Sequence, residues 1–192
     1  MRKYFSSKRI FVCLLLMLLV FTVSSADAAR VLRQKSSVVL VFNNIAATRY
    51  DDKLTVLAVE KLRKKLDGIY IEIDAEPYLK NFQGKSFENK DFAEITEQVQ
   101  GCGADYFVYA ELQPFRKETH FDLVYYDKNM EAALVLRILD LKNMRELYNK
   151  KYVMKAEDST DYFFIGSGSV AKKALEAVLF RAGEAISVKL PL

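Results

Sequence analysis

The sequence predicts an α/β fold of the α+β kind, a mixed sheet covered by helices, with the element order β-α-β-α-β-β-β-α. Two apolar runs, residues 38–42 and 106–110, carry this prediction, because neither contains a residue that would turn towards water. Such strands lie inside a sheet and are buried on both faces. Residues 29–192 have the length of one domain and no linker that would divide them, so we expect a single domain.

The first half of the chain predicts two strands and two helices. The strand at 38–42 ends at Asn43, and Asp51 or Asp52 caps the helix that follows. The apolar stripe of this helix consists of Leu54, Leu57, Ala58, Leu62 and Leu66. A strand at 69–73 has three isoleucines on one face, and its alternation leaves the other face partly exposed. A short helix entered through Pro77 comes next, followed by a loop.

The second half begins with a helix at 91–100, which Gly101 ends in a left-handed cap. The strand at 106–110 follows. Residues 113–130 are the least regular part of the chain, and they predict either an edge strand with a loop or an arm that faces a partner. After them come a hairpin and a last helix, at 169–189, which Ser169 caps.

The hairpin has arms at 132–140 and 146–155, joined by a turn at 142–145. Its second arm contains Lys150 and Lys151. Lysines on an outer strand discourage pairing with other chains, so we expect this arm to be a charged edge of the sheet.

Residues 1–28 predict a secretory signal. Four basic residues precede a charge-free apolar run at 10–23, which is short for a membrane span, and cleavage is expected after Ala28. The expected location is therefore the periplasm. The alternative is an uncleaved anchor in the inner membrane, and membrane contact is expected only through such a segment. Cys13 lies inside the apolar run, where it does not fit a lipoprotein signal.

Charge and cysteine content narrow the functional classes. The chain has 29 Lys+Arg and 25 Asp+Glu, and the signal holds four of the former and one of the latter, which leaves 25 against 24. A nearly neutral domain does not indicate nucleic-acid binding. Only Cys102 remains after the signal, so no disulfide within the chain is expected.

Motifs that would indicate catalysis or a cofactor are weak. Residues 166–171 match a dinucleotide-binding glycine pattern, but they precede the last helix rather than the first one of a βαβ unit. Cys102 and His120, the remaining thiol and imidazole, are read as a packing residue and a loop residue. We expect no catalytic residue, no cofactor and no metal site.

The candidate partner-binding residues lie in the irregular segment and in the charged edge. Aromatic side chains that alternate with charges recur at interface centres, although the same alternation is common in ordinary sheet. The candidates are Phe115, Phe121, Tyr125, Tyr126, Lys150 and Lys151.

Residues 38–44, 103–112 and 136–148, together with the alanine-rich last helix, resemble the envelope domain shared by the curli secretion channel CsgG, the penicillin-binding-protein activator LpoB and the amino-terminal domain of TolB. The resemblance implies a mixed sheet covered by helices and a role in contacts with other envelope components. CsgG and LpoB are lipoproteins, whereas this signal lacks the lipidated cysteine. Residues 113–130 are too charged to form membrane hairpins, so a channel is not expected.

The sequence therefore favours a non-catalytic exported domain that binds an envelope protein or assembly, in an accessory or regulatory role. Whether it forms a homo-oligomer is left open. Two rival classes remain. One is an envelope hydrolase that uses Cys102 or a carboxylate pair, and the other is a small-ligand carrier with a dry cavity of several hundred Å3.

Overall fold

The computed structural model describes residues 35–48, 50–122, 125–160 and 167–191. Within it, Ser36–Leu192 form one compact unit. The predicted signal, with its cleavage site and the alternative anchor, lies outside the described residues. So does Gly166, the first residue of the glycine pattern.

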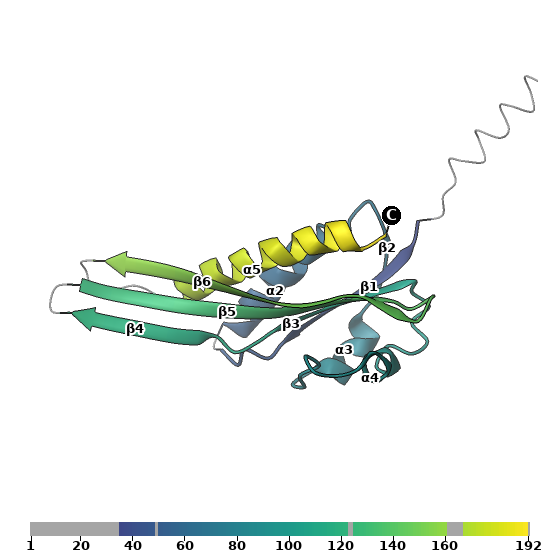
Figure 1. Cartoon of the computed structure of the whole chain (residues 1–192), viewed down its shortest axis with the longest axis horizontal. Helices are drawn as coiled ribbons and strands as arrows, with labels where there is room; N and C mark the ends of the chain where they lie inside the picture. Colours follow the sequence, from purple (N-terminus) through teal and green to yellow (C-terminus); the bar gives the residue numbers. More distant parts are fainter. Residues whose placement is uncertain (1–34, 49, 123–124, 161–166, 192) are drawn as a thin grey trace, which may run out of the picture. The chain divides into compact units, whose positions relative to one another are not determined.

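A mixed sheet of six strands forms the centre of this α+β domain (Figure 1). The strands are β1 (Ser37–Asn44), β2 (Ile71–Ile73), β3 (Tyr106–Leu112), β4 (Arg116–Asp122), β5 (Tyr125–Asp140) and β6 (Arg145–Thr160). β1 runs parallel to β2 and to β3, whereas β5 runs antiparallel to β3, β4 and β6. β3 and β4 pair one after the other along one side of β5, and β6 pairs along its other side. β6 and β2 are therefore outer strands of the described sheet.

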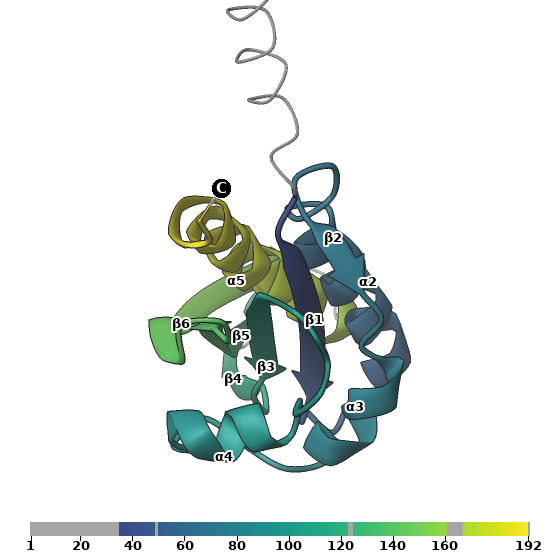
Figure 2. The same ribbon diagram turned by 90° about the vertical axis from the view of Figure 1, so that its right-hand side faces the viewer.

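Two helices cover each face of the sheet (Figure 2). One face carries α2 (Asp51–Arg63) and α5 (Ser167–Lys189), and the other carries α3 (Glu76–Phe82) and α4 (Phe92–Glu97). β1 shows why its sequence is apolar throughout. Val38, Leu40 and Phe42 pack towards α2 and α5, while Val39 and Val41 pack towards α3 and α4.

The predicted fold class and the two interior strands are confirmed. Phe107, Val108, Tyr109 and Ala110 of β3 are all fully buried. The predicted hairpin is also present, although its strands are longer than expected at sixteen residues each. Gly101 has the predicted left-handed backbone, with φ of 79°, but it is not the helix cap, because α4 ends at Glu97 and its C-cap is Gln98.

Several local predictions are wrong. The N-cap of α2 is Tyr50 rather than Asp51 or Asp52, and the Asp51 carboxylate instead accepts hydrogen bonds from the backbone N–H and hydroxyl of Thr48. α5 begins at Ser167, two residues before the predicted cap Ser169.

The strand predicted at 69–73 is reduced to the three residues of β2. Ile69, outside β2, and Ile71 are 43% and 52% exposed, and of the three isoleucines Ile73 packs against the core. For the segment 113–130 the edge-strand alternative is confirmed, because β4 ends the strand order of the sheet, and the segment is more regular than expected because it also contains the start of β5. His120, predicted to lie in a loop, belongs to β4.

Candidate functional site

The structure separates the six predicted partner-binding residues into three places. The backbones of Phe121 and Tyr126 face each other in the β4–β5 ladder, and Tyr125 faces Asp122. The side chains of Phe121, Tyr125 and Tyr126 lie outside the described part of the structure. Phe115 is half-buried and packs against the core between the sheet and α5.

Lys150 and Lys151 lie on opposite faces of β6, as neighbours in a strand must. Lys151 is on the face away from α5, where its Nζ lies 2.9 Å from Oε1 of Glu88. Lys151 and Phe115 both line a cavity of about 300 Å3. Lys150 is on the α5 face and lines a different cavity.

That second cavity, which we call the β6/α5 groove, has a volume of about 420 Å3. It is lined by Tyr148, Lys150, Tyr152, Met154, Arg181, Glu184, Ala185, Val188 and Lys189. The alternation of β6 supplies the tyrosines and Lys150, and successive turns of α5 supply the other wall. Val188, at 76% exposure, is one of the most exposed apolar side chains that the structure describes.

Two tyrosines organise the groove. The hydroxyls of Tyr148 and Tyr152, four residues apart, lie 2.6 Å from each other. The Nζ of Lys150 lies 5.2 Å from the centroid of the Tyr152 ring, and that of Lys189 lies 5.9 Å from the centroid of the Tyr148 ring. These distances suit cation–π contacts. Burial, followed by the hydrogen bond to Tyr148, raises the pKa of Tyr152, so this phenol stays protonated at neutral pH.

A buried polar network on the other face of the sheet was not predicted. Glu111 is fully buried, and its carboxylate accepts hydrogen bonds from four donors. The donors are the hydroxyls of Tyr109 and Ser86, the backbone N–H of Phe87 and the side-chain amide of Gln113. The network therefore ties the loop between α3 and α4 to β3.

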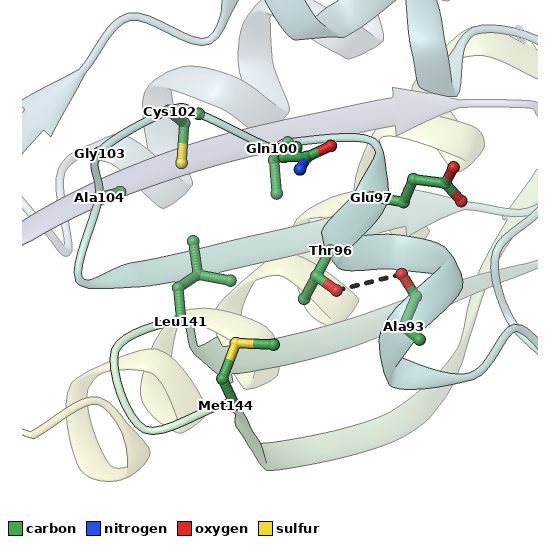
Figure 3. Close-up of a pocket in the computed structure, with 11 residues that line it drawn as sticks. Ala93, Thr96, Glu97, Gln100, Cys102, Gly103, Ala104, Leu141 and Met144 are labelled. Carbon is green, nitrogen blue, oxygen red and sulfur yellow. Dashed lines mark hydrogen bonds between the residues drawn. The ribbon is translucent and has the colours of Figure 1, made fainter.

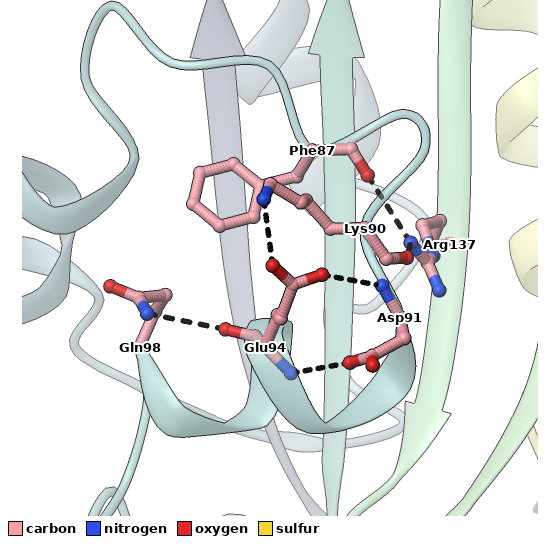
Figure 4. A network of polar contacts seen from close by, with 6 residues as sticks. All are labelled: Phe87, Lys90, Asp91, Glu94, Gln98 and Arg137. Carbon is pink, nitrogen blue, oxygen red and sulfur yellow. Dashed lines mark hydrogen bonds and ion pairs between the residues drawn. The ribbon is translucent and has the colours of Figure 1, made fainter.

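Arg137 of β5 completes this attachment (Figure 4). Its side chain is only 2% exposed, and its guanidinium donates to the carbonyl oxygens of Phe87 and Lys90 and, at 2.6 Å, to Oε1 of Glu146. The loop then enters α4 through a capping box between Asp91 and Glu94. Every buried polar side chain that the structure describes in this region has a partner inside the protein, so we read the network as structural. The feature of the sequence that could have indicated this network is Glu111, a charged residue in the otherwise apolar strand β3.

Cys102 lines a cavity of about 400 Å3 between α4 and the β5–β6 turn (Figure 3). Its side chain points into the cavity, and Leu141 and Met144 lie on the opposite wall. Among the described residues, Glu97 is the only carboxylate in the lining, which contains no histidine or lysine. Cys102 also contacts the core between the sheet and α4, in agreement with its predicted packing role.

Cys102 and His120 do not form a pair. Cys102 precedes β3, whereas His120 belongs to β4, beyond the other end of β3. The seven residues of β3 place about 23 Å of strand between the two segments. A cysteine nucleophile needs an adjacent base, and His120 is not positioned to be that base.

No helix among the described residues is long and apolar enough to cross a bilayer.

No protein-family model and no curated protein matches the chain. Among solved structures it is similar to a hypothetical protein from Chlamydia trachomatis, with 13% identity, coverage of 81% of this chain and 97% of that chain, and a TM-score of 0.49. A lipoprotein from Neisseria meningitidis matches with 15% identity, coverage of 78% and 99%, and a TM-score of 0.42. The LpoB C-terminal domain from Salmonella enterica matches with 12% identity, coverage of 67% and 90%, and a TM-score of 0.32.

LpoB is one of the proteins that the sequence resembles.

Proposed function

We propose that this chain is an exported, non-catalytic accessory domain that binds another protein of the cell envelope through the β6/α5 groove. The observation that carries the proposal is the pair of hydrogen-bonded tyrosines, Tyr148 and Tyr152, flanked by cations in an open groove. Tyrosine and arginine are among the residue types that most often dominate the energy of protein interfaces. The groove contains both.

The groove is organised before any partner arrives. The two tyrosine hydroxyls are hydrogen-bonded to each other, and Lys150 and Lys189 lie near the two rings. Side chains that are already ordered lose little conformational entropy on binding, which favours affinity. Val188 adds exposed apolar surface at the rim, and burying such surface contributes to association.

The charges of the groove favour an acidic partner. Three cations line it, Lys150, Arg181 and Lys189, against the single carboxylate of Glu184 among the described residues. Such an imbalance speeds association with a surface of opposite charge and rejects basic proteins. The signal predicted at residues 1–28 and the sequence resemblance to LpoB support a partner in the envelope.

Photo-crosslinking in cells tests the proposal. A benzoylphenylalanine at position 188 stands at the rim and leaves both tyrosines intact. We expect one envelope protein to be captured, and we expect capture to fall when Arg181→Glu or Tyr152→Ala is added. Lys53→Glu makes the same charge change as Arg181→Glu, but at an exposed position on α2. It should therefore leave capture unchanged. Equal capture in all variants, or no specific product, would refute the proposal.

The cavity at Cys102 supports a second candidate, the small-ligand carrier. Its volume of about 400 Å3 suits a small molecule, and much of its lining is apolar, including Val99, Leu141 and Met144. Native mass spectrometry of the protein purified from cells should then find a bound molecule. Leu141→Trp should fill the cavity and remove it. If the protein without the substitution shows only the mass of the chain itself, no ligand is retained in the cavity.

A further inference from the structure

Strand β6 is an open edge of the sheet over the part that the structure describes. It pairs with β5 on one side only, and Figure 1 shows it as an outer strand of the sheet. Residues 151–157 alternate between exposed and half-buried, and Val153 is 47% exposed. A long edge with a free row of backbone N–H and C=O groups is a template for another strand.

We propose that β6 pairs antiparallel with β6 of a second copy of this chain, so that the two sheets join across a twofold axis. Twofold dimers are the commonest symmetric assemblies, and each copy contributes the same surface. In a parallel, in-register pairing each lysine would lie beside its own copy. The inference does not depend on the proposed partner of the β6/α5 groove, because it uses the strand edge.

The ladder geometry limits the possible registers. In an antiparallel pair, two facing residues either hydrogen-bond to each other or both point their backbone groups away. Along a regular strand this alternation has a period of two. A symmetric pairing of β6 with itself must therefore set odd residues against odd residues and even against even, with one residue at the centre of the interface.

The charges of β6 then favour one centre, Met154. This register sets Lys151 against Glu157 of the second copy, and Lys150 against position 158, which is an aspartate in the sequence. Symmetry repeats both pairs. Opposite charges facing each other across strands are stabilising, and like charges are destabilising. No pair of like charges faces each other in this register.

Other centres along the regular ladder, which begins at Tyr148, are less favourable. Centres on Lys150, Lys151 or Lys155 set a lysine against itself, and a centre on Val153 sets Lys151 against Lys155. A centre on Ala156 gives opposite charges only between Lys155 and Glu157. The lysines that discourage general aggregation of this edge thus also select the Met154 register.

The surroundings of Lys151 are compatible with the added contact. Its ammonium lies 2.9 Å from Glu88 and has three N–H donors, so it can bind Glu157 of the copy as well. Glu157 is exposed. In the same register Val153 lies diagonally across from Val153 of the second copy. This contact would remove exposed apolar surface from water.

Charge reversal tests the pairing. Sedimentation of the full chain, purified after export, should show a dimer that Lys151→Glu or Glu157→Lys weakens by about tenfold or more, since each change acts twice. The double variant Lys151→Glu/Glu157→Lys should restore dimerisation, and the control Lys53→Glu should not affect it. A monomer at every concentration, or a dimer that these changes leave intact, would overturn the inference.

A cysteine pair tests the register without altering charge. In a Cys13→Ser/Cys102→Ser background, Met154→Cys places each thiol beside its copy, with Cα atoms about 4.5 to 5.5 Å apart, which a disulfide can bridge. Ala156→Cys places the copies about 13 Å apart or more. We expect a disulfide dimer from position 154 only. Equal yields from both positions, or a disulfide from 154 to a different protein, would contradict the pairing.

Discussion

The hydroxyl of Tyr109 donates to Oε2 of Glu111 at 2.5 Å, and both side chains are fully buried on the α3/α4 face of β3. Residues two apart on a strand share a face, so their neighbourhood follows from the strand itself. Asn43 of β1 donates to the same hydroxyl at 3.0 Å. Burial, followed by the contact with Glu111, raises the pKa of Tyr109, so its phenol stays protonated and remains a donor.

Tyr109→Phe should lower the free energy of unfolding by about 1–3 kcal/mol, because it removes a donor from a buried carboxylate that water cannot reach. Urea denaturation followed by circular dichroism measures this. Tyr78→Phe is the matched control, since Tyr78 is half-buried on the same side and contributes its ring rather than its hydroxyl to the packing. Equal losses in both variants would show that the hydrogen bond to Glu111 is not the cause.

Arg137→Ala should cost about 3–5 kcal/mol, because it leaves Glu146 and the carbonyls of Phe87 and Lys90 without their buried donor. Amide exchange in the loop before α4 should also accelerate. Arg116→Ala is the control: this arginine is 85% exposed and lies 3.8 Å from Glu131, so its loss should cost less than about 1 kcal/mol. A similar small effect of both changes would contradict the anchoring role of Arg137.

Asp105 should contribute to acid sensitivity. The backbone N–H and the hydroxyl of Ser37 donate to its Oδ2 at 2.8 and 3.0 Å, and these bonds hold the pKa of the carboxyl below its usual 3.8. Folding thus favours the ionised form. This stabilisation is complete above the unfolded pKa and is lost as the pH falls through the lower folded pKa.

Asp105→Asn should therefore flatten part of the decline in stability on the acid side. Urea denaturation at a series of pH values from neutral to strongly acidic measures the effect. If the free energy of unfolding falls equally steeply with decreasing pH in the variant and the parent, Asp105 does not contribute to the acid sensitivity.

Two glycine substitutions should have opposite effects. Gly101 has φ of 79° and open space where a Cβ would be added, so Gly101→Ala should cost about 1 kcal/mol through backbone strain alone. Gly183 lies inside α5, where an added Cβ would meet the flexible Lys65 side chain at 3.0 Å. Gly183→Ala should stabilise the protein by up to about 1 kcal/mol, because alanine favours helix. Thermal unfolding of both variants tests the contrast.

Strands buried on both faces were the most predictable part of the fold. The run 106–110 has no residue suited to water, so only an interior position accommodates it. Ile71 shows the limit of that reasoning. Alternation assigns residues to faces, but it does not say how far a helix covers a given face, and β2 lies at the edge of the sheet.

The polar network and the β6/α5 groove depend on segments that are far apart in the chain. Glu111 meets Ser86, and Tyr148 meets Lys189, only because the sheet and helices bring them together. Local periodicity contains no such information. The edge position of Lys150 and Lys151 was predictable, because charged residues on a terminal hairpin arm favour an outer strand. The aromatic wall beside Lys150 was not.

The position of α5 in the chain has a consequence for biogenesis. α5 follows every strand, yet it supplies a large part of the cover for β5 and β6 through residues such as Ala174 and Val178. A nascent chain that has emerged only as far as β6 therefore has a completed ladder with a bare, water-exposed apolar side. Such an intermediate is prone to self-association until α5 docks on the sheet.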